Sequence, residues 1–452
     1  MYLFEEALEI PSSDGHRGIL GHVERWLGEN SVDGRIPIRF AFVEVGDRSY
    51  HCEMGVMAGP KPHPPQSIFH FVQRQVEITD HFNVVMLVPT GVGANIGGHA
   101  GDATPAAALL ASVSDTLILH PNVVNASDLI DLPSNALYVE GSVITRLMMG
   151  TAGLQKVRSN RVLVLIEHHE DELFNEAAIN AVNAARATYG LMCPQVIQLD
   201  RAFQMRSRYT ASGRAAGEVD RLESLIQALD QHRDEYDAIA MSSIISVPIS
   251  YHTDYFEKAG SMVNPWGGVE AILTHALSTL YDVPAAHSPM LESQDVLNID
   301  TGIVDPRMAA EIVSVTFLES VLKGLQKSPK IVSGAEALSH PGILTASDIA
   351  CLVIPDGCVG LPTLAALEQG ISVIAVRENA NLMRSDLTIL PWATGQLHIV
   401  ENYWEAAGVL AAIKAGIDPD AVRRPLPPTI VQESAITSPQ AKETLIDHFT
   451  PF

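Results

Sequence analysis

The sequence has few cysteines and few positive charges. Its 452 residues include four widely spaced cysteines, which excludes a disulfide framework or a CxxC-type zinc site as the basis of the fold. Its 29 Lys and Arg residues stand against 53 Asp and Glu residues, giving a formal net charge of −24. Affinity for nucleic acid comes from cations that neutralise phosphates. We therefore expect neither nucleic acid nor an anionic membrane as a partner.

Long apolar runs are also missing. Gly, Pro or polar residues interrupt every stretch that approaches the roughly 20 apolar residues needed to span a bilayer. The opening MYLFEEALEIPSSDG lacks the basic and apolar regions of a signal peptide. We therefore expect a soluble protein of the reducing cytoplasm. Hydrophobic residues still make up 47% of the chain, which excludes disorder as its main state and favours a homo-oligomer.

From residue 68 onward, short β-branched runs alternate with amphipathic or alanine-rich segments, the pattern of βαβ units. The expected fold class is α/β with a doubly wound, mostly parallel sheet, and two Rossmann-like halves around a cleft are one such arrangement. Strands are predicted over 83–89, 116–119, 161–166, 195–199, 238–241, 349–354 and 372–376. Helices are predicted over 105–112, 172–189, 215–232, 267–281, 306–326, 362–369 and 403–415.

The composition predicts four regions. Residues 1–65 form a small α+β module, with a helix over 18–27 and strands over 36–45 and 50–57, and the Pro-rich stretch 59–66 is its linker. Residues 66–240 form a first α/β half. Residues 241–305, rich in Ser, His, Pro and Asn, form a long irregular insertion, a type of segment that is usually functional. Residues 306–452 form the second half and a Pro-rich tail.

A glycine-rich loop is the most informative segment. In VVMLVPTGVGANIGGHAGDATPAAALLA, residues 84–111, a buried strand runs into five glycines and then into a helix. Such a loop lets backbone approach a ligand, and a helix start favours an anion, although a turn that only serves packing is the alternative. The loop has no Lys and no GxGxxG spacing, which excludes a P-loop NTPase. The predicted anion contacts are Gly91, Gly93, Asn95, Gly97, Gly98, Asp102 and Thr104. Asp102 is alternatively an N-cap of the helix, and His99 is a candidate acid–base group.

A second segment, IACLVIPDGCVGLPTLAALEQGISVIAV over residues 349–376, again reads strand, loop, helix, strand. Cys358 precedes the helix, whose field lowers a thiol pKa, so Cys358 is a candidate nucleophile as well as an ordinary small loop residue. The strand that follows the helix ends in polar residues, where an open α/β sheet binds its ligand. The predicted anion contacts here are Gly357, Gly360, Thr363, Arg377, Glu378 and Asn379.

Residues 349–379 resemble the phosphate-binding unit of nucleotide-sugar epimerases and two-domain glycosyltransferases, with a small-residue loop, a short helix and a Gly before a hydrophobic strand. Those families carry a ribose-binding Glu midway along the helix, where this chain has Leu364, Ala365 and Ala366. The segment is also similar to the second-cysteine region of aspartate/hydantoin racemases and maleate isomerases. At the position of their first cysteine this chain has Thr90 and Gly91.

Histidines supply further candidates. The stretch HPNVVNASD places His120, Asn122 and Asn125 directly after a strand. They are either an acid–base group with two ligand contacts or the residues of an ordinary turn. A divalent metal is only weakly indicated, because the histidines lack i,i+4 pairing. The weak candidates are His252, Asp254, His275 and His287. The prediction therefore contains no metal site and leaves the cofactor open.

From about residue 68 to 426 the chain resembles an uncharacterised family of cyanobacteria and plants, a domain of unknown function. The resemblance rests on GVGANIGGHAGDATPAA, HPNVVNASD and GLPTLAALEQGISVIAVRENAN. The family supplies no reaction or catalytic residue, and it implies a soluble protein of photosynthetic lineages.

The sequence thus predicts an enzyme that acts on a small anionic metabolite held by the two glycine loops, with His99 or His120 as the acid–base group. An isomerase, epimerase or lyase is favoured over a redox enzyme, because no nicotinamide or flavin fingerprint is present. Two alternatives remain open. One is a racemase or amidohydrolase that depends on Cys358, and the other is a metabolite sensor or assembly protein without turnover.

Overall fold

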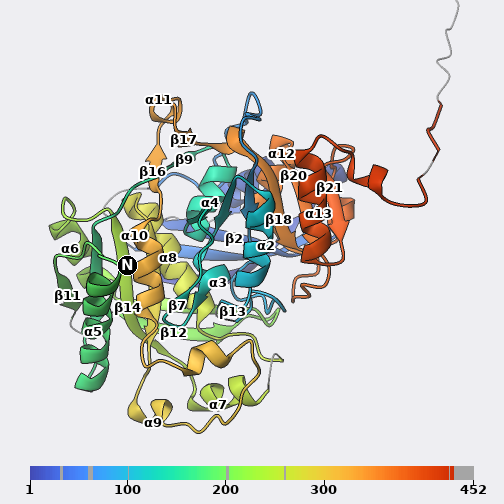
Figure 1. Cartoon of the computed structure of the whole chain (residues 1–452). Helices are drawn as coiled ribbons and strands as arrows, with labels where there is room; N and C mark the ends of the chain where they lie inside the picture. Colours follow the sequence, from blue (N-terminus) through green and yellow to red (C-terminus); the bar gives the residue numbers. More distant parts are fainter. Residues whose placement is uncertain are drawn as a thin grey trace, which may run out of the picture.

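The computed structural model describes residues 1–30, 34–59, 65–99, 101–199, 203–258, 261–426 and 428–431. These residues form a mixed α/β fold built on two large sheets (Figure 1). Parts of the predicted linker and of the Pro-rich tail, residues 60–64 and 432–452, lie outside the described residues.

The first sheet is parallel throughout. Its strand order is β21 (Leu397–Val400), β20 (Ser372–Val376), β18 (Ile349–Pro355), β4 (Asn83–Met86), β5 (Thr116–Leu119) and β8 (Ala136–Tyr138). Alternate residues of these apolar runs pack into two different cores: Val84 and Met86 face α2 (Thr104–Val113) and α13 (Tyr403–Lys414), while Val85 faces α4 (Gly141–Met148) and α12 (Leu361–Gln369). Coverage on both faces explains why the strands are continuously apolar.

The second sheet is mixed. Its order is β11 (Val196–Leu199), β10 (Val162–Glu167), β14 (Ala238–Ser246), β12 (Gln204–Tyr209), β13 (Ala215–Asp220), β1 (Tyr2–Pro11), β3 (Ser49–Ala58), β2 (Arg35–Val45) and β19 (Val359–Gly360), with β15 (Ala285–Met290) also on β14. Pairing is parallel from β11 through β10 and β14 to β15. It is antiparallel from β12 through β13, β1, β3 and β2 to β19. One strand connects the two sheets, because β19 lies in the loop after β18 and pairs with β2.

Helices cover both faces of the parallel part of this second sheet. One core joins it to α5 (Glu172–Thr188) and α10 (Leu318–Gln326), and another joins it to α6 (Glu223–Gln231) and α8 (Gly267–Tyr281). The chain after β14 and β15 forms α7 (Ile249–Glu257), α9 (Gln294–Leu297) and the 3-10 turn η2 (Ala309–Ile312), and α7 and α9 lie together at the bottom of Figure 1.

The remaining elements are short, apart from α1 (Ile19–Asn30). The small sheets are β16 (Lys330–Ser333), β9 (Ala152–Gln155) and β17 (Ile343–Leu344), and β6 (Asn125–Ala126) with β7 (Leu129–Ile130). The other helices and turns are α3 (Pro121–Val124), α11 (Ala335–Leu338), η1 (Asp14–His16), η3 (Ala346–Asp348), η4 (Leu387–Ile389) and η5 (Pro419–Val422). None of the described helices combines the length and apolar character that crossing a membrane requires.

The structure confirms the α/β class and every predicted strand core. The first sheet is parallel as predicted, whereas the second sheet is mixed and not clearly doubly wound. The helix over 215–232 is wrong at its start: residues 215–220 form β13, in which a Cβ on Gly217 would collide with Val269. The helix over 306–326 is also wrong at its start, since α10 begins only at Leu318.

The predicted domain boundaries stay a prediction. Three strands of the first 58 residues, β1, β2 and β3, pair in the same sheet as β13, so this region contributes to the second sheet. Strand β1 was not predicted, because its sequence, YLFEEALEIP, alternates too weakly. The predicted insertion 241–305 contains the end of β14, α7, α8, β15 and α9.

Candidate functional site

A cavity of about 410 Å³ lies between the two sheets. Its walls include residues that follow the carboxyl ends of β4, β5 and β8, together with the ends of β14 and β15 and residues of β2 and α8. Open α/β sheets place ligands at the carboxyl ends of their parallel strands. The position and size of this cavity are therefore those of a small-molecule site.

Three helices of eight or more residues begin at the cavity. The first residues of α4, α8 and α12, Gly141, Gly267 and Leu361, all line it. The first turn of a helix has N–H groups without intrahelical partners and carries partial positive charge. Three such starts around one space favour an anion or a developing negative charge there.

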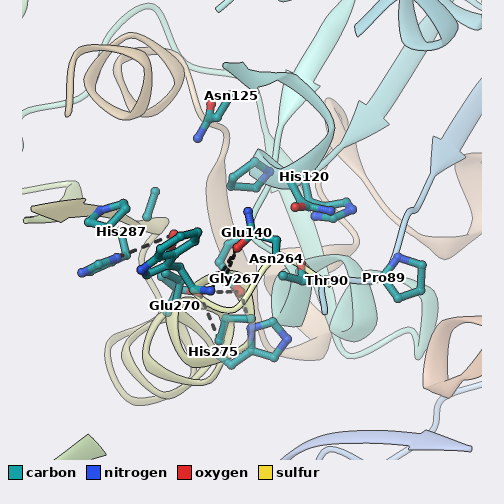
Figure 2. Close-up of a pocket in the computed structure, with 18 of the residues that line it drawn as sticks. Pro89, Thr90, His120, Asn125, Glu140, Asn264, Gly267, Glu270, His275 and His287 are labelled. Carbon is teal, nitrogen blue, oxygen red and sulfur yellow. Dashed lines mark hydrogen bonds and ion pairs between the residues drawn. The ribbon is translucent and has the colours of Figure 1, made fainter. Parts of the chain in front are cut away.

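A buried carboxylate–imidazole pair forms part of the wall. Glu140 caps α4 by accepting a hydrogen bond of 2.8 Å from the Ser142 N–H, and its Oε1 lies 2.6 Å from Nδ1 of His275 on α8 (Figure 2). Burial alone would raise the pKa of Glu140, but the interactions with His275 and Ser142 outweigh it and lower the pKa. A histidine whose Nδ1 faces a carboxylate can act as a general base through its second ring nitrogen.

His120 lines the cavity as a neutral imidazole. Its Nε2 accepts a hydrogen bond of 3.2 Å from the Val88 N–H, which assigns the ring proton to Nδ1. Burial lowers the pKa of His120 to about 4. At neutral pH the ring is therefore a hydrogen-bond donor at Nδ1, a form that can polarise a carbonyl without carrying charge.

A second imidazole–carboxylate pair involves His287 on β15. Its Nδ1 lies 3.6 Å from Glu270 Oε2 (Figure 2). Its Nε2 lies 2.8 Å from Ser243 Oγ. The order serine, histidine, glutamate is that of a hydrolase triad. However, Ser243 is fully buried and does not line the cavity, whereas His287 and Glu270 do. Ser243 therefore positions the His287 ring, and the geometry gives it no access to a substrate carbonyl.

Two arginines lie within a buried cluster of four charges. Arg214 pairs with Glu5 and, at 2.5 Å through Nε, with Glu53. Arg39 donates to Glu5 at 3.1 Å and to the Thr90 carbonyl at 2.7 Å. Burial would lower the pKa of Arg214, but Glu5 and Glu53 outweigh it and raise the pKa, while burial and Arg214 lower the pKa of Arg39 to about 10. Both arginines are among the residues that line the cavity, and the cluster has no net charge.

Several polar atoms of the cavity wall are buried without a hydrogen-bond partner among the described residues. Leaving such a group unsatisfied costs about 1–3 kcal/mol, so folding alone does not favour the arrangement. A ligand with complementary polar groups would satisfy these atoms. They are Asn125 Oδ1, Ser127 Oγ, Arg146 Nη1, Arg214 Nη1, His275 Nδ1, Thr279 Oγ1, His287 Nδ1 and Ser288 Oγ. Three of them, on Arg146, His275 and His287, lie within ion-pair distance of a carboxylate without hydrogen-bond geometry.

The weak metal candidates do not converge. His252 lies 3.1 Å from Glu292, and Asp254 pairs with Lys258 on the surface. His275 and His287 each face a different carboxylate, as described above. Within the described residues, no three His, Cys, Asp or Glu side chains are grouped so that they could hold a metal ion.

The first glycine loop packs against the protein itself. A Cβ on Gly91 would lie 2.5 Å from the Ala215 carbonyl oxygen, and one on Gly98 would overlap the Ala94 carbonyl oxygen. Asp102 accepts hydrogen bonds from the Gly97 and His99 N–H groups, and burial raises its pKa to about 6. None of the seven predicted contacts in this loop lines the cavity, so their contact with an anion stays a prediction: Gly91, Gly93, Asn95, Gly97, Gly98, Asp102 and Thr104.

His99 also lies outside the cavity wall. Its Nδ1 lies 2.7 Å from the Tyr255 hydroxyl of α7, which donates at 3.0 Å to Glu311 and accepts at 3.3 Å from Asn264. Burial lowers the pKa of His99 to about 4. The structure thus separates the two predicted acid–base histidines: His120 lines the cavity, and His99 joins the glycine loop to α7.

The second loop is divided in the same way. In this segment, Cys358, Gly360 and Thr363 line the cavity, whereas Gly357 does not. Asn122 and Asn125, which follow β5, also line it. Burial raises the pKa of Cys358, so the neutral thiol dominates at neutral pH, and this geometry does not supply a thiolate nucleophile.

The polar residues after β20 lie away from the cavity. Asn379 donates to the Ile96 carbonyl and the Tyr403 hydroxyl, each at 2.8 Å, and it accepts from the Ile96 N–H at 2.8 Å. Arg377 is half exposed and pairs with Glu401 at 2.8 Å. Glu378 is exposed. Asn379 therefore holds the glycine loop in place.

Sequence reasoning missed Glu140, Glu270, Arg39 and Arg214. Glu140 carried no clear signal, because the residues preferred as N-caps are Ser, Thr, Asp and Asn, and the capping role of Glu140 is visible only in the structure. No signal marks the arginines, since nothing in the sequence shows that Arg39 and Arg214 are buried together.

Comparison with known proteins places the chain among uncharacterised sequences. It is 35% identical over 341 residues to a curated protein described as "Uncharacterized lipoprotein syc1174_c" of Synechococcus sp. (strain ATCC 27144 / PCC 6301 / SAUG 1402/1), which covers 75% of this chain and 92% of the relative. No solved structure matches. The predicted resemblance to an uncharacterised cyanobacterial family is confirmed. A match over residues 83–423 shows that the chain belongs to the family described as "Protein of unknown function (DUF3326)".

Proposed function

We propose that this protein is an enzyme that performs general acid–base chemistry on a small anionic metabolite in the cavity between the sheets. The observation that carries the proposal is the Glu140–His275 pair, a buried carboxylate 2.6 Å from an imidazole in the wall of the cavity. An isomerase, epimerase or lyase fits best, because each of these reactions can proceed through removal of a proton next to a carbonyl.

Each residue has a role in this proposal. His275 removes the proton through its Nε2, and Glu140 orients the ring and stabilises its protonated form. His120 donates its Nδ1–H to the oxygen on which negative charge develops. The N-termini of α4, α8 and α12 add their partial positive charge.

Native mass spectrometry of the purified protein, followed by denaturing release, would identify a co-purified ligand. The reaction is tested by incubating small carboxylic and phosphorylated metabolites with the protein in D₂O and following the loss of C–H signals by proton NMR. The wild type should catalyse exchange on at least one metabolite class. His275→Gln and Glu140→Gln should reduce the rate 10²–10⁴-fold, the usual contribution of general acid–base catalysis.

The matched control is His340→Gln, because His340 is exposed and does not line the cavity. It should leave the exchange rate unchanged. Exchange that survives both His275→Gln and Glu140→Gln would contradict the proposed roles. Tight binding without exchange or product would instead favour the non-catalytic metabolite sensor.

We further propose that the protein works in the cytoplasm as a homo-oligomer and that the six-stranded parallel sheet with its helices is a Rossmann-like half. Four free cysteines suit a reducing compartment. Cell fractionation tests the location, and light scattering coupled to size-exclusion chromatography tests the oligomeric state.

A further inference from the structure

The unpartnered polar atoms of the cavity wall specify what a ligand must present. Arg214 is 1% exposed, and its Nε and Nη2 donate hydrogen bonds to Glu53 and Glu5, while Nη1 has no partner among the described residues. Because Nη1 only donates, the ligand needs an acceptor there. Asn125 Oδ1 only accepts, because its Nδ2 donates to the Tyr138 hydroxyl at 2.9 Å, so the ligand needs a donor there. A ligand with acceptors alone does not satisfy both atoms.

Three hydroxyl groups join these two atoms. The hydroxyl groups of Ser127, Thr279 and Ser288 are buried, line the cavity and have no partner among the described residues. A hydroxyl both donates and accepts, and the group that matches several of them at once is another hydroxyl. The wall is therefore complementary to a ligand with several hydroxyl groups.

The charges of the wall limit the charge of the ligand. The positive charges of Arg39 and Arg214 are balanced by Glu5 and Glu53, and that of Arg146 by Asp282. Further carboxylates of the wall, Glu140, Glu270 and Glu292, face histidines. A dianionic phosphate would be repelled by this excess of carboxylates, whereas one carboxylate group fits the unpartnered Nη1 of Arg214.

We propose, resting on the function proposed above, that the ligand is a monocarboxylic acid with several hydroxyl groups. Its carboxylate accepts from Arg214 Nη1, and its hydroxyls bond to Asn125 and to the hydroxyl groups of Ser127, Thr279 and Ser288. A cavity of about 410 Å³ is large enough for a small metabolite of this class.

Isothermal titration calorimetry of the full chain tests the proposal with a matched set of probes. The set contains the five- and six-carbon aldonates, such as D-gluconate, D-galactonate and D-xylonate. Three comparison probes each change one property: D-glucitol lacks the carboxylate, hexanoate lacks the hydroxyls, and 6-phosphogluconate adds a phosphate. At least one aldonate should bind ten-fold or more tightly than each comparison probe.

Variants assign the binding to the cavity. Ser288→Ala and Thr279→Val remove hydroxyl groups that have no partner among the residues the structure describes, so each should keep or raise Tm while weakening the aldonate five-fold or more. Ser278→Ala is the matched control, since Ser278 is also buried and unpartnered among the described residues but does not line the cavity. It should leave the aldonate Kd unchanged.

The outcomes are separable. The proposal is overturned if no aldonate binds with a Kd below 10 mM, if hexanoate or 6-phosphogluconate binds as tightly, or if Ser288→Ala and Thr279→Val bind like the wild type. Aldonate binding that depends on these hydroxyls supports it even without deuterium exchange, in which case the enzymatic proposal alone fails.

Discussion

The glycine-rich loop and the cavity wall differ in how their polar groups are satisfied. In the loop, the Gly97 N–H donates to Asp102, the Gly97 carbonyl accepts from Asn122, and both backbone groups of Ile96 bond to Asn379. On the wall, Arg214, Asn125 and Ser288 each keep a buried polar atom without a partner among the described residues. Glycine content therefore marks close backbone packing here, and unpartnered side chains mark the place suited to a ligand.

The substitution with the largest expected effect removes a cation from the buried cluster of four charges. Arg214→Met leaves Glu5 and Glu53 in a buried position without their main cation, and removing one partner of a buried pair costs about 3–5 kcal/mol. Because the pKa of Glu53 is lowered in the folded protein, its stabilisation is present above its unfolded pKa and is lost as pH falls. The variant should therefore lose less stability at pH 4 than at pH 7, measured by urea unfolding.

The control for this change is Arg161→Met. Arg161 also binds a carboxylate, at 2.8 Å, but both side chains are more than 40% exposed, so the expected loss is only about 0.5 kcal/mol. Equal losses for the two variants would show that Arg214 is not stabilised by its buried partners.

The next effect tests whether the loop is packed. Gly98→Ala places a methyl group against the Ala94 carbonyl oxygen, which forces backbone to move and should cost about 2–3 kcal/mol. Gly21→Ala on α1 is the matched change, since a Cβ there meets nothing within 4 Å. It should stabilise the protein by about 0.5–1 kcal/mol, because alanine is the better helix former. A stable Gly98→Ala variant would mean that the loop has room to receive a ligand.

Much of this difference between the glycine-rich loop and the cavity wall could not be predicted from the sequence. The strand and helix cores could be predicted, because apolar runs alternate with amphipathic segments along β4, β5, β18 and β20. His120 and Cys358 were placed correctly after strands, since that position depends only on local pattern. The pairing of Glu140 with His275 could not be predicted, because the two residues are 135 positions apart in the sequence and meet only through the packing of α4 against α8.

The third prediction concerns a titration inside the loop. Burial raises the pKa of Asp102 to about 6, so between about pH 4 and 6 the folded protein holds a proton that the unfolded chain releases. Stability contributed at Asp102 therefore falls as pH rises through this window. Asp102→Asn keeps an acceptor for the Gly97 N–H and removes the titration, so its advantage over the wild type should grow from pH 4 to 6 and reach about 2 kcal/mol.

The measurement is the difference in unfolding free energy between Asp102→Asn and the wild type across this pH range. His99 and His120 have lowered pKa values and lose stability as pH falls from about 6.5 to 4, but both are present in each protein and cancel in the difference. A difference that does not change with pH would show that Asp102 is not buried as described.

The smallest expected effect separates the two candidate locations for an anion. Arg377 follows β20, where the sequence predicts an anion contact, but its side chain is 54% exposed and its ion-pair partners within the described part of the chain are Glu401 and Asp356. Arg377→Ala should therefore change stability by less than about 0.5 kcal/mol and leave ligand affinity unchanged. If an anion instead binds beside β20, the loss of this charge should weaken it at least ten-fold while Ser288→Ala has no effect. Calorimetry with one ligand gives the affinities of Arg377→Ala and Ser288→Ala. Their ratio decides between the strand end that the sequence indicates and the cavity wall that the unpartnered atoms indicate.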